Sequence, residues 1–179
     1  SVMLTGGRSA ARLHETWADL PDFRNSQGVS FFFGDERCVP ADHPESNYGM
    51  AMRTLFRSGI PPGCSVRRME ADNNDLVSAA RSYCEVLPDR IDVLILGVGE
   101  DGHIASLFPG SPALREANMR VVPVTSPFPP GKRLTITPPV IAQAMTVFVL
   151  APGPAKAKIL TNALQAGHES EQLPLHLAM

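Results

Sequence analysis

The residues with the clearest capacity for chemistry lie in the segment GVGEDGH, from Gly97 to His103. It places Glu100, Asp101 and His103 close together, and an unperturbed imidazole titrates near pH ~6.5, where a general base is effective. Three interleaved glycines allow backbone conformations closed to other residues and let the chain approach a ligand closely. A lone histidine more often closes a turn, but these neighbours favour a catalytic loop centred on His103.

A strand must hold this loop in place. Ile91 and the run from Val93 to Leu96 are mostly β-branched or Leu, which is typical of a parallel strand covered on both faces. In open α/β sheets, ligands bind outside the carboxyl ends of the strands. The loop that begins at Gly97 is therefore expected at the ligand-binding edge of a sheet.

A second glycine turn, Gly6-Gly7, follows a short apolar run at 2–5. Ser9 can cap the helix that comes next. The apolar positions of this helix recur every three or four residues, at Leu13, Trp17 and Leu20. Such a turn presents free backbone N–H groups at a helix N-terminus, where a phosphate binds well. The alternative is an ordinary turn, because Gly-Gly is a common turn dipeptide.

A third polar loop follows the apolar run at 29–33 and contains the motif DERCVP. The next helix, predicted to reach Leu55, opens with the residues SN. The polar residues expected on the same rim as the glycine loops are Asp35, Glu36, Arg37, Ser46 and Asn47. The alternative is a solvated charge cluster with Ser46 as a helix N-cap.

Cations follow two later segments. Lys132 and Arg133 emerge from SPFPPG, where three prolines exclude regular structure, into an alternating strand-like run. Lys156 and Lys158 lie in the first turns of a helix after a predicted buried strand at 147–151. Lysines are unfavourable there against the helix dipole unless an anion lies nearby. The alternative is a pair of exposed lysines on a solvated face.

The alternation of strands and helices predicts one α/β domain over residues 1–179, with a doubly wound, mainly parallel sheet and helices on both faces. The opening SVMLTGG starts in a strand and the closing LPLHLAM starts an apolar segment. We therefore expect the domain to be incomplete at both termini.

Composition narrows the class of protein. A net charge of −2 gives no sign of a nucleic-acid surface. The cysteines Cys38, Cys64 and Cys84 lack CxxC spacing, which argues against a disulfide framework and a structural zinc site. No apolar run is long enough to span a membrane, and from the first residues we expect no charged leader followed by an apolar core. We expect a cytoplasmic protein with no nucleic-acid or membrane partner.

Together the loops resemble a known family. GGRS at 6–9, DERCVP followed by SN at 46–47, LGVGEDGHIASLFPG at 96–110 and PP..R.T at 129–135 occur in the order seen in 6-phosphogluconolactonases. The related glucosamine-6-phosphate deaminases share DGH but usually continue as IAFNEP, so the residues SLFP at 106–109 favour the lactonases. Arg8 and Ala10 depart from the small polar residue and proline often seen after GG.

This resemblance implies a Rossmann-like fold of the NagB/RpiA type and hydrolysis of 6-phospho-D-glucono-1,5-lactone to 6-phosphogluconate, a step of the oxidative pentose phosphate pathway. It implies no metal or organic cofactor, a phosphorylated sugar lactone as the partner molecule, and a monomer or homodimer. Hydrolysis of a lactone needs a positioned water, a base and stabilisation of the oxyanion. We expect His103 as the base, oriented by Asp101 or Glu100. The residues expected to bind substrate are Gly6, Gly7, Asp35, Arg37, Ser46, Asn47, Gly99, Arg133 and Lys156.

Other functions remain open at this level. Gly97-Val98-Gly99 is similar to a dinucleotide fingerprint, but Glu100 and Asp101 would crowd the pyrophosphate with negative charge. A metal site would have only these two acids to join His103. An isomerising deaminase of an amino sugar phosphate, or a sugar-phosphate-binding protein without catalysis, would use the same loops.

Overall fold

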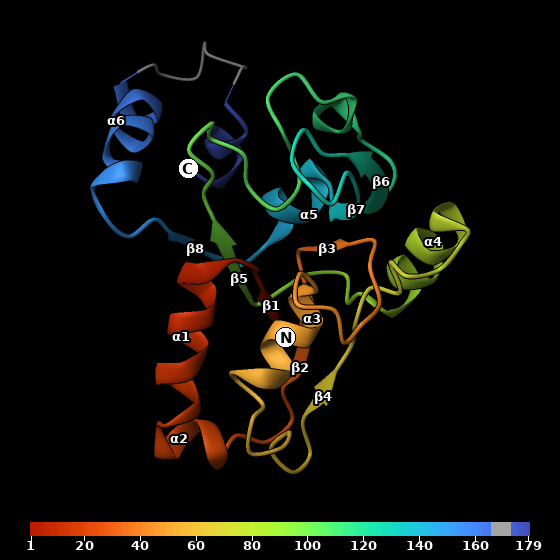
Figure 1. Ribbon diagram of the computed structural model, residues 1–179, viewed down its shortest axis with the longest axis vertical. Helices are drawn as coiled ribbons and strands as arrows, with labels where there is room; N and C mark the ends of the chain where they lie inside the picture. Colours follow the sequence, from red (N-terminus) through yellow and green to blue (C-terminus); the bar gives the residue numbers. More distant parts are fainter. Residues whose placement is uncertain (166–172) are drawn as a thin grey trace.

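The computed structural model describes residues 1–165 and 173–179, and a parallel sheet forms its centre (Figure 1). The strands run in the order β4 (Ser65–Val66), β2 (Ser30–Phe33), β1 (Val2–Leu4), β5 (Val93–Gly97), β8 (Thr146–Leu150), and every neighbouring pair is parallel. The inner strands β2, β1 and β5 coincide with apolar runs of the sequence because strands inside a parallel sheet are covered on both faces. The prediction of a mainly parallel α/β sheet is confirmed.

The strand order reverses direction beside β1. From β1 the chain moves to β2 and β4 on one side, and then returns to β5 and β8 on the other. The loops that leave β1 and β5 therefore separate at a topological switch point, where open α/β sheets leave a crevice at the carboxyl ends of their strands. These are the loops that begin with Thr5 and Val98.

Two cores lie on opposite faces of the sheet, because successive side chains of a strand alternate between faces. On one face Leu4 packs with Phe31 and Phe33 against α1 (Arg8–Ala18), α2 (Pro21–Arg24) and α3 (Asn47–Arg53). On the other face Met3 and Leu96 join a core with α4 (Leu76–Val86), α5 (Pro138–Gln143) and α6 (Ala157–Gln165). The described residues also include three short 3-10 helices: Pro112–Arg115, Pro154–Lys156 and Pro174–Ala178.

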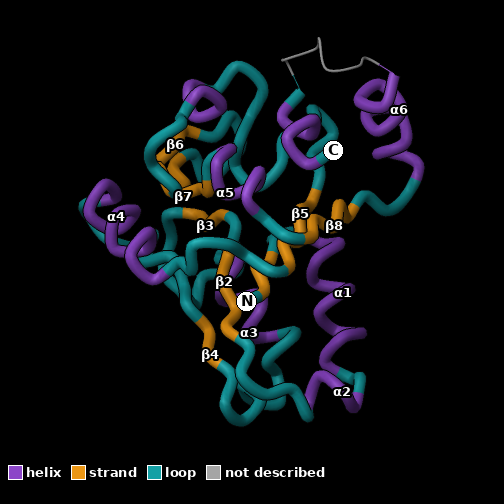
Figure 2. The backbone as a smooth tube through the Cα atoms, turned by 180° about the vertical axis from the view of Figure 1, so that it is seen from behind, coloured by secondary structure: helices purple, strands orange, loops and turns teal. Residues whose placement is uncertain are grey.

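A second, antiparallel sheet was not predicted from the sequence. Its order is β3 (Asp35–Arg37), β7 (Lys132–Ile136), β6 (Val121–Thr125). Figure 1 and the reverse view in Figure 2 both place it beside α4 and α5, away from α1 and α2. Because β3 pairs with β7, the DER motif lies next to the segment that carries Arg133, with Arg37 opposite Arg133 and Asp35 opposite Thr135.

Three local predictions were wrong. Gly7, not Ser9, is the N-cap of α1, and no side chain caps that helix. The helix ends at Ala18, so Leu20 is not on its apolar face and is 50% exposed. The strand predicted as buried at 147–151 is the edge strand β8, and its Phe148 is 57% exposed.

Among the described residues, no helix has the length and hydropathy needed to cross a bilayer.

Candidate active site

A pocket of about 210 Å³ lies at the switch point and collects residues from both sheets. Nine residues predicted to form the site line this pocket: Gly6, Gly7, Asp35, Arg37, Asn47, Gly99, His103, Arg133 and Lys156. The other two, Ser46 and Asp101, do not line it. Asp101 contacts Nδ1 of His103, and Ser46 caps α3.

The His103 ring is held by Asp101. Nδ1 of His103 lies 2.5 Å from Oδ1 of Asp101, and the same oxygen accepts a hydrogen bond from the His103 N–H at 3.2 Å. A carboxylate can only accept, so Nδ1 carries the proton and Nε2 is the basic nitrogen of the neutral ring. Of the two acids considered from the sequence, it is Asp101 that contacts the ring. Oε1 of Glu100 instead lies 3.9 Å from Nζ of Lys156.

Gly99 is required by this contact. A Cβ atom at Gly99 would overlap the His103 imidazole and the Asp101 carboxylate. The Gly99 N–H also donates to the His103 carbonyl at 2.8 Å, which closes the loop into a tight turn. The Leu175 N–H donates to the Gly102 carbonyl at 3.1 Å, so the segment at 173–179 supports the same turn.

The two acids of the DER motif, Asp35 and Glu36, are buried and Arg37 is partly buried, so the alternative of a solvated charge cluster was wrong. Glu36 is 3% exposed and its carboxylate accepts hydrogen bonds from Ser46 Oγ and from three backbone N–H groups, those of residues 37, 47 and 48. Burial raises the pKa of Glu36, and these hydrogen bonds oppose the rise. The Glu36 carboxylate thereby fixes the start of α3, where Ser46 acts as the expected N-cap and accepts from the Gly49 N–H at 3.0 Å.

Asn47 connects the glycine turn after β1 with the DER motif. Its Nδ2 donates to the backbone carbonyl of Asp35 at 2.9 Å and to Oδ1 of Asp35 at 3.1 Å. A Cβ atom at Gly6 would overlap the Asn47 amide, so the glycine turn after β1 is what lets Asn47 reach this position. The amide and the carboxylate together form one wall of the pocket.

Arg133 lies beside this wall and is 6% exposed. Its Nη1 is 3.4 Å from Ser106 Oγ and 4.0 Å from Asp35 Oδ2, and its guanidinium lies over the Phe108 ring at 5.7 Å. Burial lowers the pKa of Arg133, and the Asp35 carboxylate partly offsets this. A buried guanidinium with long contacts retains donors for an anionic ligand.

Two further cations face the same space. Arg37 donates through Nη1 to the Glu45 carbonyl at 2.6 Å, while its buried Nε has no partner among the described residues. Lys156, at the end of a 3-10 turn before α6, has a side chain 20% exposed. The pocket therefore brings together three of the cations that the sequence analysis proposed for anion binding.

The N-terminus of α1 adds backbone donors. Gly7 is its N-cap, no side chain caps it, and its first turn contains no acid. The first N–H groups of a helix have no partner within the helix, and the dipole favours an anion there. Residues 6–9 all line the pocket.

Sequence reasoning missed several residues around the site. Ser106 and Thr135 are fully buried and connect the His103 loop to β7 through a hydrogen bond of 3.1 Å from the Ser106 N–H to Thr135 Oγ1. Phe108 and Phe128 pack beside the His103 ring, with ring centroids at 4.8 and 6.1 Å. Ser106 and Phe108 belong to the SLFP motif and Thr135 to PP..R.T, but these motifs did not indicate the contacts that the residues make.

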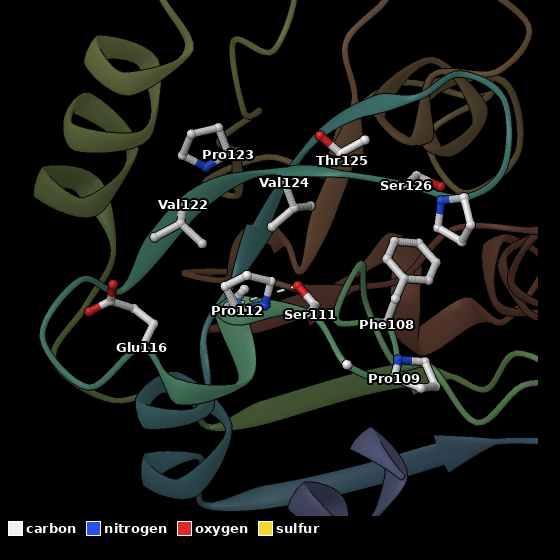
Figure 3. A pocket seen from close by; sticks show the side chains of 13 residues that line it. Phe108, Pro109, Ser111, Pro112, Glu116, Val122, Pro123, Val124, Thr125 and Ser126 are labelled. Carbon is white, nitrogen blue, oxygen red and sulfur yellow. Dashed lines mark hydrogen bonds between the residues drawn. The ribbon is translucent and has the colours of Figure 1, made fainter. Parts of the chain in front are cut away.

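Phe108 also lines a larger and more open cavity of about 630 Å³, between residues 108–116 and β6 (Figure 3). Four prolines and two valines are among the residues that line it, and Glu116 lies at one end. The smaller pocket combines a base with cations, so chemistry rather than volume identifies the candidate site. No three His, Cys, Asp or Glu side chains in the described part of the chain are grouped so that they could hold a metal ion.

Comparison with known proteins decides the family. A model of the family described as glucosamine-6-phosphate isomerases/6-phosphogluconolactonase matches residues 1–179. The chain belongs to this family. The resemblance drawn from the loop motifs is therefore confirmed.

Curated members of the glucosamine-6-phosphate isomerase/6-phosphogluconolactonase family include similar proteins from distant organisms. The 6-phosphogluconolactonase of Mycobacterium tuberculosis is 38% identical over 177 residues, which cover 91% of this chain and 71% of that protein. The human 6-phosphogluconolactonase is 40% identical over 157 residues, which cover 82% of this chain and 59% of that protein.

A solved structure of the family shows the same architecture. The 6-phosphogluconolactonase from Thermotoga maritima superposes with a TM-score of 0.83 at 28% identity, covering 98% of this chain and 78% of that one. The parallel sheet thus belongs to a fold that a 6-phosphogluconolactonase also adopts.

Proposed function

We propose that this chain hydrolyses 6-phospho-D-glucono-1,5-lactone to 6-phospho-D-gluconate, the lactone-opening step of the oxidative pentose phosphate pathway. The observation that carries the proposal is the joint placement, in one pocket, of the Asp101-oriented His103 and the cations Arg37, Arg133 and Lys156. Relatives named 6-phosphogluconolactonase support it. The proposal requires a base at one end of the substrate and an anion site at the other.

His103 acts as the general base. With Nδ1–H donated to Asp101, Nε2 takes a proton from a water molecule as its oxygen adds to the lactone carbonyl. The Asp101 carboxylate stabilises the imidazolium that forms, in the same way that a carboxylate supports histidine in hydrolytic triads. Positioned general-base catalysis of this kind contributes roughly 10²- to 10⁴-fold to the rate.

Collapse of the tetrahedral intermediate completes the reaction. The carbonyl re-forms, the bond from the carbonyl carbon to the ring oxygen breaks, and the imidazolium returns its proton to that oxygen as the leaving hydroxyl. The new carboxylic acid then ionises. Cations that surround the pocket stabilise the negative charge on the former carbonyl oxygen while the intermediate exists.

The 6-phosphate binds at the opposite end of the pocket. The uncapped N-terminus of α1 offers backbone N–H groups, and Arg37 and Arg133 offer guanidinium donors. Arg37 has a buried Nε without a described partner, which a phosphate oxygen would satisfy. Asp35 and Asn47 then lie near the sugar hydroxyls, to which a carboxylate and an amide can both hydrogen-bond.

Three measurements separate this function from the alternatives. A coupled assay with freshly generated lactone should show turnover above spontaneous hydrolysis, while glucosamine 6-phosphate should release no ammonia. Calorimetry with 6-phosphogluconate, run on the same sample, should show binding. Ammonia release would favour the deaminase, and binding with a background rate of hydrolysis would favour a protein that binds sugar phosphates without catalysis.

A further inference from the structure

Ser106 connects the loop of His103 with Asp35 and Arg133. It lies three residues after His103 and is fully buried. Its Oγ donates to Oδ2 of Asp35 at 2.6 Å and lies 3.4 Å from Nη1 of Arg133 as an acceptor. One hydroxyl therefore contacts both the Asp35 carboxylate and the Arg133 guanidinium.

The contact between Asp35 and Arg133 depends on this hydroxyl. Their charged atoms are 4.0 Å apart, which is beyond hydrogen-bond distance, so Ser106 occupies the position of a bridge between them. Asp35 is held from its other oxygen by the Asn47 amide at 3.1 Å. Removal of the Ser106 hydroxyl would leave Asp35 with one side-chain donor and Arg133 with its contact to the Pro130 carbonyl at 3.4 Å.

Ser106 and His103 also belong to one stiff segment. Val98 and Leu107 each form an isolated bridge with Ile104, so the loop folds back on itself around this buried side chain. Between them, Ala105 has a φ of 48°, a backbone conformation that residues with side chains seldom adopt. Strain of this kind persists where the surrounding structure fixes it, and it turns the Ser106 side chain toward Asp35.

We propose that Ser106 is a positioning residue that sets the distance between the His103 base and the Arg133 guanidinium, and so selects lactones that carry a phosphate at the far end. The inference rests on the proposed function. Ser106 itself does not line the pocket, so it acts on the substrate through Asp35 and Arg133.

The test is Ser106→Ala, which removes one oxygen atom and keeps the fold of the loop. We expect kcat/KM for the 6-phosphorylated lactone to fall about tenfold, mainly through KM, because a contact to a charged group is lost. The rate with unphosphorylated glucono-1,5-lactone should change less than about twofold. Ser111→Ala is the matched control, since among the described residues the Ser111 hydroxyl hydrogen-bonds only with the Ala113 N–H of its own turn.

A double-mutant cycle with Arg133→Ala distinguishes positioning from general loosening of the fold. If Ser106 acts through Arg133, then Ser106→Ala should change kcat/KM less than about twofold in the Arg133→Ala background. Equal losses with both lactones, an undiminished effect in that background, or unchanged kinetics in Ser106→Ala would each overturn the inference.

Binding keeps this inference separate from the proposed function. Calorimetry with 6-phosphogluconate should show the same pattern: weaker binding in Ser106→Ala than in the wild type, and no further loss when Arg133 is already absent. A wild-type protein that binds 6-phosphogluconate without hydrolysing the lactone would refute the proposed function alone. Equal affinity of the wild type and Ser106→Ala would refute the positioning role alone.

Discussion

Nδ1 of His103 and Oδ1 of Asp101 lie 2.5 Å apart, inside a turn that Gly99 makes possible. This contact assigns the proton to Nδ1 and leaves Nε2 as the basic nitrogen of the neutral ring. The proposed chemistry of the pocket therefore depends on a short loop at the end of one strand, β5. Each part of this relationship can be altered separately.

Asp101→Asn should lower kcat by about tenfold or more with little change in KM, because the amide can donate to Nδ1 and stabilise the tautomer that protonates Nε2. The measurement is the steady-state rate with 6-phosphogluconolactone, corrected for spontaneous hydrolysis. Glu100→Gln is the comparison, since Glu100 is paired with Lys156 rather than with the ring. A loss in Glu100→Gln as large as that in Asp101→Asn would contradict the assigned roles.

Gly99→Ala should lower kcat strongly, because the added Cβ would overlap the imidazole and displace it. Gly131→Ala serves as the control: a Cβ there meets no atom closer than the Ser126 carbonyl oxygen at 4.0 Å. Kinetics and thermal unfolding of both variants would be compared with the wild type. An active Gly99→Ala enzyme would show that the packing of Gly99 against His103 is not needed.

Arg133→Ala should raise KM roughly 10- to 100-fold and change kcat much less, because a charge-assisted contact to phosphate contributes about 1.5–3 kcal/mol to binding of both ground state and transition state. Arg133→Lys should recover part of this loss, since it restores the charge but not the planar donors. Steady-state kinetics with the phosphorylated lactone measure both. A fall in kcat at unchanged KM would argue against phosphate binding by Arg133.

His14 gives a prediction on stability rather than activity. It is 1% exposed, its Nδ1 lies 3.4 Å from Thr54 Oγ1, and burial lowers its pKa from 6.5 to about 4. Because the unfolded chain binds the proton more tightly, the free energy of unfolding should fall as the pH drops from 6.5 toward 4, by up to about 1.4 kcal/mol per pH unit from this group.

Urea unfolding of the wild type and His14→Met across that range would measure the effect. The variant should lose less stability on acidification, since its side chain at this position takes up no proton. Parallel losses in the two proteins would show that His14 does not carry the pH dependence.

Much of the architecture was predictable because buried parallel strands produce continuous apolar runs and their carboxyl ends meet at one edge. That geometry also explains why loops after β1 and β5, far apart in the sequence, line one pocket. The antiparallel sheet was not predictable in the same way. Its β3 strand is the polar triplet Asp35–Arg37, whose burial depends on partners supplied by other elements.

Individual side chains were harder to predict for the same reason. The chemistry of Ser106 alone does not distinguish it from another loop serine. Its role depends on Asp35 and Arg133, which other elements bring next to it. The helical phase likewise did not show that His14 faces the interior while Leu20 lies beyond the helix end. Sequence periodicity predicts that an element exists more reliably than it predicts which side chains become partners across elements.

The most direct test of the central claim compares wild type with His103→Gln in a fast coupled assay that uses freshly generated 6-phosphogluconolactone. We predict wild-type turnover well above spontaneous hydrolysis and a loss of roughly 10²- to 10⁴-fold in kcat for the variant, with 6-phosphogluconate affinity and thermal unfolding near wild type. A His103→Gln protein that retains wild-type turnover, or a wild-type protein that never exceeds the spontaneous rate, would contradict the account.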